Sequence, residues 1–211
     1  MNNATLINQD SGIVEYGTPG YIIDRARGVM GGINLDPASD EIFNKAIKAD
    51  LFYDKKIDGL TREWHGSVWM NHPFGRGELA CVANKKCFKK RCDPTLSQIN
   101  QPANWRGHCV YHDTPGNADW INKLVSEYER GHTRTACCVT YAATSETWFR
   151  PLLSFPQCFL HGRTSYVGVD GRPVFGNTKG SVVTYLGKNV RTFVDWFRDI
   201  GTIKIAYGEL P

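Results

Sequence analysis

A stretch of four residues, Asn71-His72-Pro73-Phe74, combines groups that suit chemistry on the exocyclic amine of a planar base. The Asn71 amide oxygen can accept one amine hydrogen, and the main-chain carbonyl of His72, held extended by Pro73, can accept the other. Two such acceptors favour the pyramidal amine, whose nitrogen lone pair is then available for attack. The Phe74 ring can stack on the base. The stretch therefore predicts attack by an amino nitrogen on an electrophile that needs positioning more than activation.

A second stretch, residues 36–39 with the sequence Asp-Pro-Ala-Ser, directly follows a short apolar run, as the first stretch does. Residues 33–35 precede it, and residues 67–70 precede Asn71. Both runs are typical of buried parallel strands that end in a loop. Because open α/β sheets bind ligands at the carboxyl ends of such strands, we expect both stretches at one edge of the same sheet.

The rest of the chain predicts alternating helices and strands that position these two stretches. Helix starts are indicated by Thr18 as an N-cap with Pro19 in the first helical position and, further on, by Ser145 as an N-cap. Gly131 predicts the end of an amphipathic helix. The expected elements are helices over residues 21–29, 117–130, 145–153 and 190–200 and strands over residues 33–35, 67–70, 135–141, 157–167, 180–186 and 202–207. This alternation predicts a layered α/β fold.

The composition indicates one folded domain with embellishments. Hydrophobic residues make up 41% of the 211, and the chain contains 6 Trp, 9 Tyr and 10 Phe, which is enough for a substantial core. No run approaches the roughly 18 apolar residues of a membrane span. Residues 1–14 form a polar leader without a signal-peptide pattern, which predicts a cytoplasmic protein. We expect residues 15–211 to form a single domain in which residues 77–115 are inserted.

Several motifs in order resemble bacteriophage-type Dam-like DNA N6-adenine methyltransferases. They are Tyr16-Gly17-Thr18-Pro19, Leu35-Asp36-Pro37-Ala38-Ser39, Asp58-Gly59-Leu60 followed by Trp64 and Trp69, Asn71-His72-Pro73-Phe74, Gly162-Arg163 through Tyr166, and Gly180 to Gly187. One four-residue motif is weakly specific, whereas the ordered set, which covers most of the chain, is highly specific. The resemblance implies a Rossmann-like S-adenosylmethionine-dependent methyltransferase sheet. It further implies a phage or prophage enzyme that methylates the N6 amino group of adenine in DNA.

The resemblance also implies roles for individual residues. Asn71 and the His72 carbonyl hold the amino group, Pro73 stiffens the turn, and Phe74 stacks on the flipped base. The implied residues of the S-adenosylmethionine pocket are Tyr16, Thr18, Pro19, Asp36, Pro37, Ala38 and Ser39. Arg163 and Tyr166 are implied DNA contacts, with Tyr166 closing the other face of the base. The alternative for Tyr166 is packing on the adjacent strand.

Two features depart from the family pattern. His72 stands where the family usually has proline, so the carbonyl function is retained while the ring could also touch the base. The chain between the two stretches is too short for the usual strand–helix–strand–helix that supplies an acidic ribose ligand. Asp50, Asp54 and Asp58 compete for that role, and we favour Asp58 because its loop adjoins the strand that leads to Asn71.

The insertion, residues 77–115, is rich in cysteine and has no apolar core of its own. Its cysteines follow the pattern C-x5-C-x4-C-x16-C, and a tetrathiolate zinc site would supply the missing folding energy. The predicted zinc ligands are Cys81, Cys87, Cys92 and Cys109, with His108 and His112 as alternative fourth ligands. The cysteines in apolar strands, Cys137, Cys138 and Cys158, are expected to be core residues.

A basic run in the same insertion is predicted to contact the phosphate backbone of DNA. It consists of Lys85, Lys86, Lys89, Lys90 and Arg91. The alternative is a solvated surface face. The net charge of +4 favours a polyanionic partner only weakly.

Other functions use some of the same features. The same chemistry on cytosine N4 is the nearest alternative, followed by methylation of RNA or of a protein amide. The basic run favours a nucleic acid over a protein substrate. A non-catalytic, zinc-containing DNA-binding protein is a further alternative, but such a protein has no use for Asn71, Pro73 and Phe74 beside an Asp36 loop.

Overall fold

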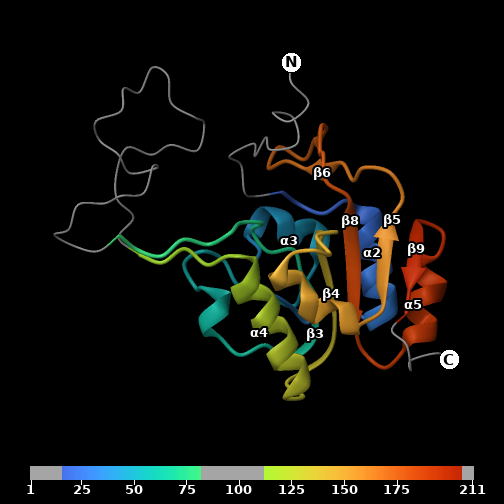
Figure 1. Cartoon of the computed structure of the whole chain (residues 1–211), viewed down its shortest axis with the longest axis horizontal. Helices are drawn as coiled ribbons and strands as arrows, with labels where there is room; N and C mark the ends of the chain where they lie inside the picture. The colour runs from blue at the N-terminus through green and yellow to red at the C-terminus, as the bar shows by residue number, and fades with distance from the viewer. Residues whose placement is uncertain (1–15, 82–111, 206–211) are drawn as a thin grey trace.

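The computed structural model describes residues 16–81 and 112–205, and a seven-stranded sheet runs through the molecule (Figure 1). Its strand order is β2-β1-β3-β4-β8-β5-β9, and β6 and β7 form a separate two-stranded sheet. The strands are β1 (Leu35–Asp36), β2 (Leu51–Phe52), β3 (Gly66–Met70), β4 (Thr133–Tyr141), β5 (Gln157–Leu160), β6 (Tyr166–Val167), β7 (Pro173–Val174), β8 (Ser181–Leu186) and β9 (Gly201–Lys204). The predicted α/β class is confirmed at this level, as a mostly parallel sheet that is compatible with a Rossmann-like fold.

Helices cover both faces of the sheet, because alternate side chains of the central strands face opposite layers. The helices are α2 (Gly20–Met30), α3 (Glu41–Ile47), α4 (Asn117–Glu129) and α5 (Val190–Phe197), with 3-10 helices η1 (Gly59–Thr61) and η4 (Thr147–Ser154). Trp69 and Cys137 belong to the core under α2 and α5, whereas Met70 and Cys138 belong to the core under α4 and η4. Cys158 is also buried, so all three strand cysteines are core residues as expected. No described helix has the length and apolarity needed to cross a bilayer.

The path of the chain through the parallel strands reverses between β1 and β3. From β1 the chain moves outward to β2 and then returns to β3 on the other side of β1. The strands β2, β1, β3 and β4 are parallel neighbours, whereas β8 runs antiparallel to both β4 and β5. Such a reversal opens a crevice at the carboxyl ends of the two strands, where α/β sheets bind their ligands. The fold therefore places a candidate site beyond β1 and β3.

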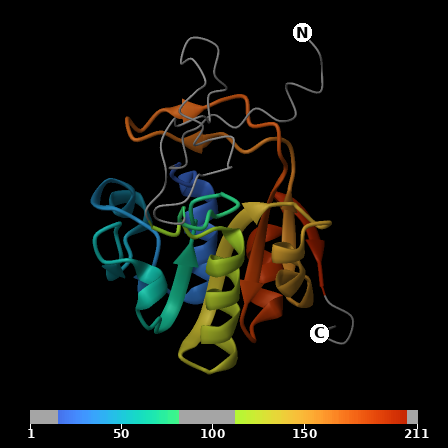
Figure 2. The same ribbon diagram turned by 60° about the vertical axis from the view of Figure 1, so that its left-hand side comes forward.

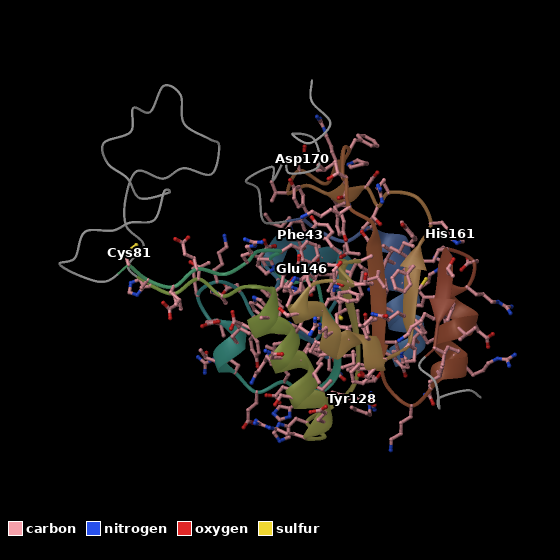
Figure 3. All side chains as sticks on the ribbon, viewed as in Figure 1. Phe43, Cys81, Tyr128, Glu146, His161 and Asp170 are labelled. Atoms are coloured by element: carbon pink, nitrogen blue, oxygen red, sulfur yellow. The ribbon has the colours of Figure 1, made fainter. Side chains whose placement is uncertain are left out.

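The insertion leaves the domain between β3 and α4 through two extended segments. We call residues 75–81 and 112–117 the stem. Its segments pair at Glu78 and Thr114, and the amide of Asn117 donates to the carbonyl of Gly75 at 2.8 Å. Cys81 lies at the outer end of the stem (Figure 3). The predicted boundaries of the insertion therefore lie within this paired stem.

Two predicted helix starts are wrong. Thr18 does not cap the first helix, because α2 begins at Gly20 with Pro19 as its N-cap residue and no side-chain cap. The helix predicted after Ser145 is the 3-10 helix η4, whose N-cap residue is Glu146. Pro151 lies inside it and has no N–H to donate, which disfavours a regular α-helix there.

The strand predicted over residues 157–167 is in fact two strands in different sheets. The strand β5 ends at Leu160, and Gly162, with φ of 71°, turns the chain away from the main sheet. The chain between the two sequence stretches also holds more than expected. It accommodates α3, β2 and η1 because the helix has only 7 residues and the strand only 2. The remaining predicted elements are present with shifted ends. The last two residues of the strand predicted over residues 202–207, and the leader of residues 1–14, lie outside the described residues.

Candidate functional site at the carboxyl ends of β1 and β3

The two chemically suggestive stretches meet at the reversal of the sheet. Asp36 is the last residue of β1, and Asn71 directly follows β3. These strands are hydrogen-bonded parallel neighbours, with Leu35 opposite Val68. The sheet therefore brings residues 36–39 and 71–74 to the same edge, as the sequence predicts.

The side chain of Asn71 is oriented by a main-chain group from far away in the sequence. Its Nδ2 donates a hydrogen bond of 2.6 Å to the carbonyl of Tyr16. Because a carbonyl can only accept, the amide nitrogen must face Tyr16 and the amide oxygen must face away. No described residue donates a hydrogen bond to that oxygen. Asn71 is thus held as an acceptor for a group outside the described chain.

Asp36 is a buried carboxyl group with little local compensation. The residue is 1% exposed, and the amide of Ala38 donates to its Oδ1 at 3.1 Å. No described Lys, Arg or His forms an ion pair with it. Burial raises the pKa of Asp36 to about 7. Since an uncompensated buried charge is unfavourable, this carboxyl is suited to a ligand that brings hydrogen-bond donors or positive charge.

The loop after Asp36 is held on two sides. On one side, the amide of Tyr53 donates to the carbonyl of Asp36 at 2.9 Å and the amide of Ser39 to the carbonyl of Tyr53 at 3.0 Å. On the other, Gly59 packs so tightly that a Cβ there would lie 2.0 Å from the carbonyl oxygen of Pro37. Only glycine allows this approach, so the turn containing Asp58 and Gly59 adjoins the loop of residues 36–39.

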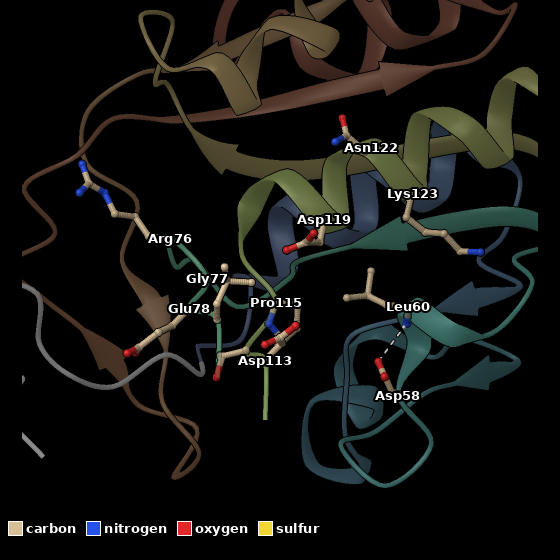
Figure 4. Close-up of a pocket in the computed structure, with 12 residues that line it drawn as sticks. Asp58, Leu60, Arg76, Gly77, Glu78, Asp113, Pro115, Asp119, Asn122 and Lys123 are labelled. Carbon is tan, nitrogen blue, oxygen red and sulfur yellow. Dashed lines mark hydrogen bonds between the residues drawn. The ribbon is translucent and has the colours of Figure 1, made fainter. Parts of the chain in front are cut away.

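Asp58 lies on the wall of a cleft of about 650 Å³ between η1, the stem and α4 (Figure 4). The lining residues include Leu60, Arg76, Asp119 and Lys123. The volume is within the range of small-molecule sites. The cleft extends from the turn that contains Asp58 to residues 76–79 of the stem, and none of residues 36–39 or 71–74 lines it.

The two alternatives to Asp58 have structural roles elsewhere. Asp50 accepts a hydrogen bond from the Asn34 side chain at 2.8 Å, and Asp54 accepts from the amides of Lys56 and Ile57. Neither lines the cleft, whereas Asp58 does. Asp58 has a local role as well, because its Oδ1 accepts from the amide of Leu60 at 3.2 Å, so only its place on the cleft wall distinguishes it and its role as ribose ligand stays a prediction.

The segment before α2 closes the site from the side. Gly17 pairs with Val167 through two backbone hydrogen bonds of 2.8 Å, and its Cα packs against the Phe43 ring. Thr18 is 4% exposed, and its hydroxyl has no hydrogen-bond partner among the described residues. Pro19 stands next to it at the start of the helix. A buried hydroxyl without a partner marks a place where a ligand can complete the hydrogen bonding.

The His72 ring points into the protein, not toward a substrate. It is 2% exposed, and its Nε2 lies 3.0 Å from Oδ1 of Asn117 at the start of α4. It stacks on Trp120 and meets the edge of Phe74, with ring centroids 6.3 and 5.2 Å away. Because an amide oxygen can only accept, Nε2 carries a proton, and burial keeps the ring neutral by lowering its pKa. The ring therefore holds His72 in place, and with it the main-chain carbonyl that is predicted to accept an amine hydrogen. The ring itself does not face the site.

Phe74 belongs to an aromatic cluster with Tyr141 and Tyr166. The Phe74 centroid lies 4.5 Å from that of Tyr141 and 6.3 Å from that of Tyr166, the latter at an interplanar angle of 76°. Tyr166 is 5% exposed and its hydroxyl is 3.1 Å from Ser181 Oγ. Rings at such an angle cannot enclose a planar base between them. This arrangement fits the packing alternative for Tyr166, and its predicted stacking on a base stays a prediction.

Three residues of the site were not identified from the sequence. Tyr141 ends β4, a position that the carboxyl-end rule could have indicated. Asn117 and Trp120 hold the His72 ring, and no sequence signal connects them to it. Their contribution depends on how α4 packs across the sheet.

The predicted zinc site and basic run lie almost entirely outside the described residues. Within the described segments, no group of three or more His, Cys, Asp or Glu side chains could hold a metal ion. Of the predicted ligands, Cys81 and the alternative His112 are placed, whereas the alternative His108 lies outside the described residues. The residues outside are Cys87, Cys92, Cys109, Lys85, Lys86, Lys89, Lys90 and Arg91. The zinc and phosphate contacts stay predictions.

Burial of His72 makes a contribution to the free energy of unfolding that depends on pH. Its pKa is lowered from 6.5 to about 4 by burial, against the opposing hydrogen bond to Asn117. Between these values the unfolded chain binds a proton that the folded protein does not, so stability is lost as the pH falls. When the pH falls from 7 to 4.5, the free energy of unfolding of the wild type should decrease by about 2–3 kcal/mol relative to that of His72→Gln. Chemical denaturation at both pH values measures the difference.

The matched control is His65→Gln, because the His65 side chain is 64% exposed. This variant should show the same pH dependence of stability as the wild type. Equal pH dependence in wild type and His72→Gln would contradict the neutral buried ring.

No protein-family model, no curated protein and no solved structure matches this chain, so the proposed function has to be argued from the geometry of the site.

Proposed function

We propose that this protein is an S-adenosylmethionine-dependent DNA methyltransferase that acts on the N6 amino group of adenine. The observation that carries the proposal is the Asn71 amide. Its nitrogen donates to the Tyr16 carbonyl at 2.6 Å, which leaves its oxygen as an acceptor at the sheet edge where Phe74 follows β3 and the buried Asp36 ends β1. An acceptor, an aromatic ring and a buried acid at one sheet edge are the parts that methylation of a base amine needs.

The residues around Asp36 suit the cofactor. S-adenosylmethionine supplies an electrophilic methyl group on a sulfonium, together with an amino group and ribose hydroxyls as donors. Asp36 lacks a cationic partner among the described residues, and the Thr18 hydroxyl lacks any hydrogen-bond partner there. Both groups would gain hydrogen bonds from such a ligand. Asp58, on the cleft wall, is the proposed acceptor for the ribose hydroxyls.

The residues around Asn71 suit the amine. The amide oxygen and the His72 carbonyl would accept the two amine hydrogens and so stabilise the positive charge that develops on nitrogen. Pro73 restricts His72 to extended geometry, and the ring bond to Asn117 fixes the same residue from the other side. Phe74 would stack on the base. The protein thus contributes positioning and preorganised acceptors and needs no covalent intermediate.

The choice of adenine and of DNA rests on the resemblance, because cytosine N4 presents an equivalent amine to the same acceptors. The non-catalytic alternative gives no reason for Asp36 to be buried without a counter-charge. The product therefore has to be identified directly.

The test is to incubate the full chain with methyl-labelled S-adenosylmethionine and unmethylated duplex DNA, then to digest the DNA and identify the nucleosides by mass spectrometry. We expect labelled N6-methyldeoxyadenosine, and none in a parallel reaction with Asn71→Ala. Labelled N4-methyldeoxycytidine would establish the cytosine alternative instead. Cofactor binding by calorimetry without any labelled nucleoside would contradict methylation of DNA.

A further inference from the structure

The β6–β7 hairpin, residues 161–180, projects past the carboxyl ends of the parallel strands (Figure 2). Asp170 at its turn lies at one end of the molecule and Tyr128 at the other (Figure 3). The hairpin is anchored to the candidate site through the pairing of Val167 with Gly17. A second anchor is Lys179, whose Nζ lies 4.8 Å above the Tyr141 ring. The hairpin is therefore the part of the described chain that overhangs the site.

The two faces of the hairpin differ in burial. Tyr166 faces the aromatic cluster, and Val174 lies opposite it in the ladder and so shares its face. Phe175 follows directly after the end of β7. It is 81% exposed, the largest fraction among the exposed large hydrophobic side chains of the described residues, and Val169 near the turn is 59% exposed. An aromatic ring this exposed is suited to contact with another molecule.

The charges around Phe175 are mainly positive. Arg163, Arg172 and Lys179 are exposed, and Asp170 is the one acidic residue between 161 and 180. Arg172 lies 3.8 Å from Asp170 in an exposed ion pair, so the segment keeps an excess of positive charge. Cations in the same hairpin as an exposed aromatic ring complement a phosphate backbone with stacked bases inside it. They fit an apolar protein surface poorly.

We propose that the β6–β7 hairpin contacts duplex DNA and that the Phe175 ring inserts into the base stack, while Arg163 and Arg172 contact phosphates. The inference rests on the proposed function, because a base that reaches Phe74 has to leave its stack. Apolar side chains inserted between base steps stabilise such an unstacked state. Phe175 is thereby the wedge residue and Phe74 the ring that receives the base.

The experiment measures binding of the full-length protein, without cofactor, to two fluorescent duplexes that differ only in a single abasic site. Opening the stack costs less free energy where a base is already missing. The protein should therefore bind the abasic duplex more tightly than the intact one. Phe175→Ala should weaken binding to the abasic duplex by about 5- to 150-fold, which corresponds to the stacking of one base. Phe175→Trp should restore it.

The controls separate the ring from the charges. Leu51→Ala removes another exposed apolar side chain, 50% exposed on the edge strand β2, and should change nothing. Arg172→Gln should lower the slope of log affinity against log salt by about one, whereas Phe175→Ala should leave that slope unchanged. Equal binding by Phe175→Ala and wild type would overturn the proposal, as would a wild type that binds neither duplex.

Two further measurements complete the test. The first asks whether the Phe175 ring contacts DNA or a second copy of the chain, and the second asks whether a variant can lose DNA binding without losing methylation, or the reverse. A wild-type dimer that Phe175→Ala converts to a monomer in light scattering would show that the ring contacts a second copy, which overturns the proposal. Nucleoside analysis is independent of the binding assay. Phe175-dependent binding without methylation would overturn the enzymatic function alone, and methylation without Phe175 dependence would overturn the hairpin inference alone.

Discussion

Asn71→Ala is expected to lower the rate of methyl transfer roughly a hundred- to a thousand-fold. The substitution removes an acceptor that the Tyr16 carbonyl holds in position through a 2.6 Å hydrogen bond. Losing one such preorganised group typically costs about 2.7–4 kcal/mol in the transition state. Single-turnover methylation of duplex DNA measures the loss. The affinities for cofactor and DNA should change much less, because the interaction strengthens as charge develops on the amine nitrogen.

The matched control is Asn189→Ala, which removes an exposed asparagine whose side chain forms no capping hydrogen bond to α5. It should methylate at the wild-type rate. If Asn71→Ala also methylates at near the parental rate, the assignment of residues 71–74 as the catalytic stretch is wrong. The greater part of the proposed function would then be wrong with it.

Asp36→Asn is expected to weaken cofactor binding and to stabilise the protein without cofactor. The affinity for S-adenosylmethionine should fall by the roughly 1.5–3 kcal/mol that hydrogen bonds to charged groups contribute. Isothermal titration calorimetry of the wild type and the variant measures this loss. Unchanged affinity would reject Asp36 as a ligand of the cofactor.

The effect on stability follows from the raised pKa of Asp36, which is 3.8 in a model carboxyl and about 7 here because of burial. Between these values the unfolded chain has lost a proton that the folded protein keeps, so stability falls as the pH rises and stays lower above pH 7. Asparagine has no such proton to lose. At pH 8 Asp36→Asn should therefore be about 2–4 kcal/mol more stable than the wild type, and near pH 4 the two should be similar.

His72 and Asp36 act on stability in opposite directions over nearly the same pH range. Neutral His72 makes stability rise between about pH 4 and 6.5, whereas Asp36 makes it fall between about pH 4 and 7. The wild-type profile should therefore be flatter than that of either variant. Asp195→Asn, on the exposed part of α5, is the control and should follow the wild type. A steep wild-type profile that neither substitution alters would contradict both assignments.

The sequence predicted most of the features that depend on local patterns. Apolar runs before Asp36 and Asn71 predicted two buried parallel strands, and hydrophobic periodicity with Gly131 predicted α4 to within a residue. The carboxyl-end rule then placed both chemical stretches at one edge. Prediction failed where a single glycine interrupts an otherwise strand-like pattern. The strand over residues 157–167 reads as continuous, but Gly162 turns it into a hairpin that leaves the sheet.

The sequence by itself determined which groups are available at the site: an amide, a constrained carbonyl, an aromatic ring and a carboxyl group, each at a strand end. Only the tertiary structure decided how they are oriented. The Tyr16 carbonyl sets which atom of Asn71 is free, and Asn117 draws the His72 ring into the core. These partners are 55 and 45 residues away along the chain. Side-chain orientation depends on contacts between elements that meet only after the sheet has formed, and no local pattern encodes them.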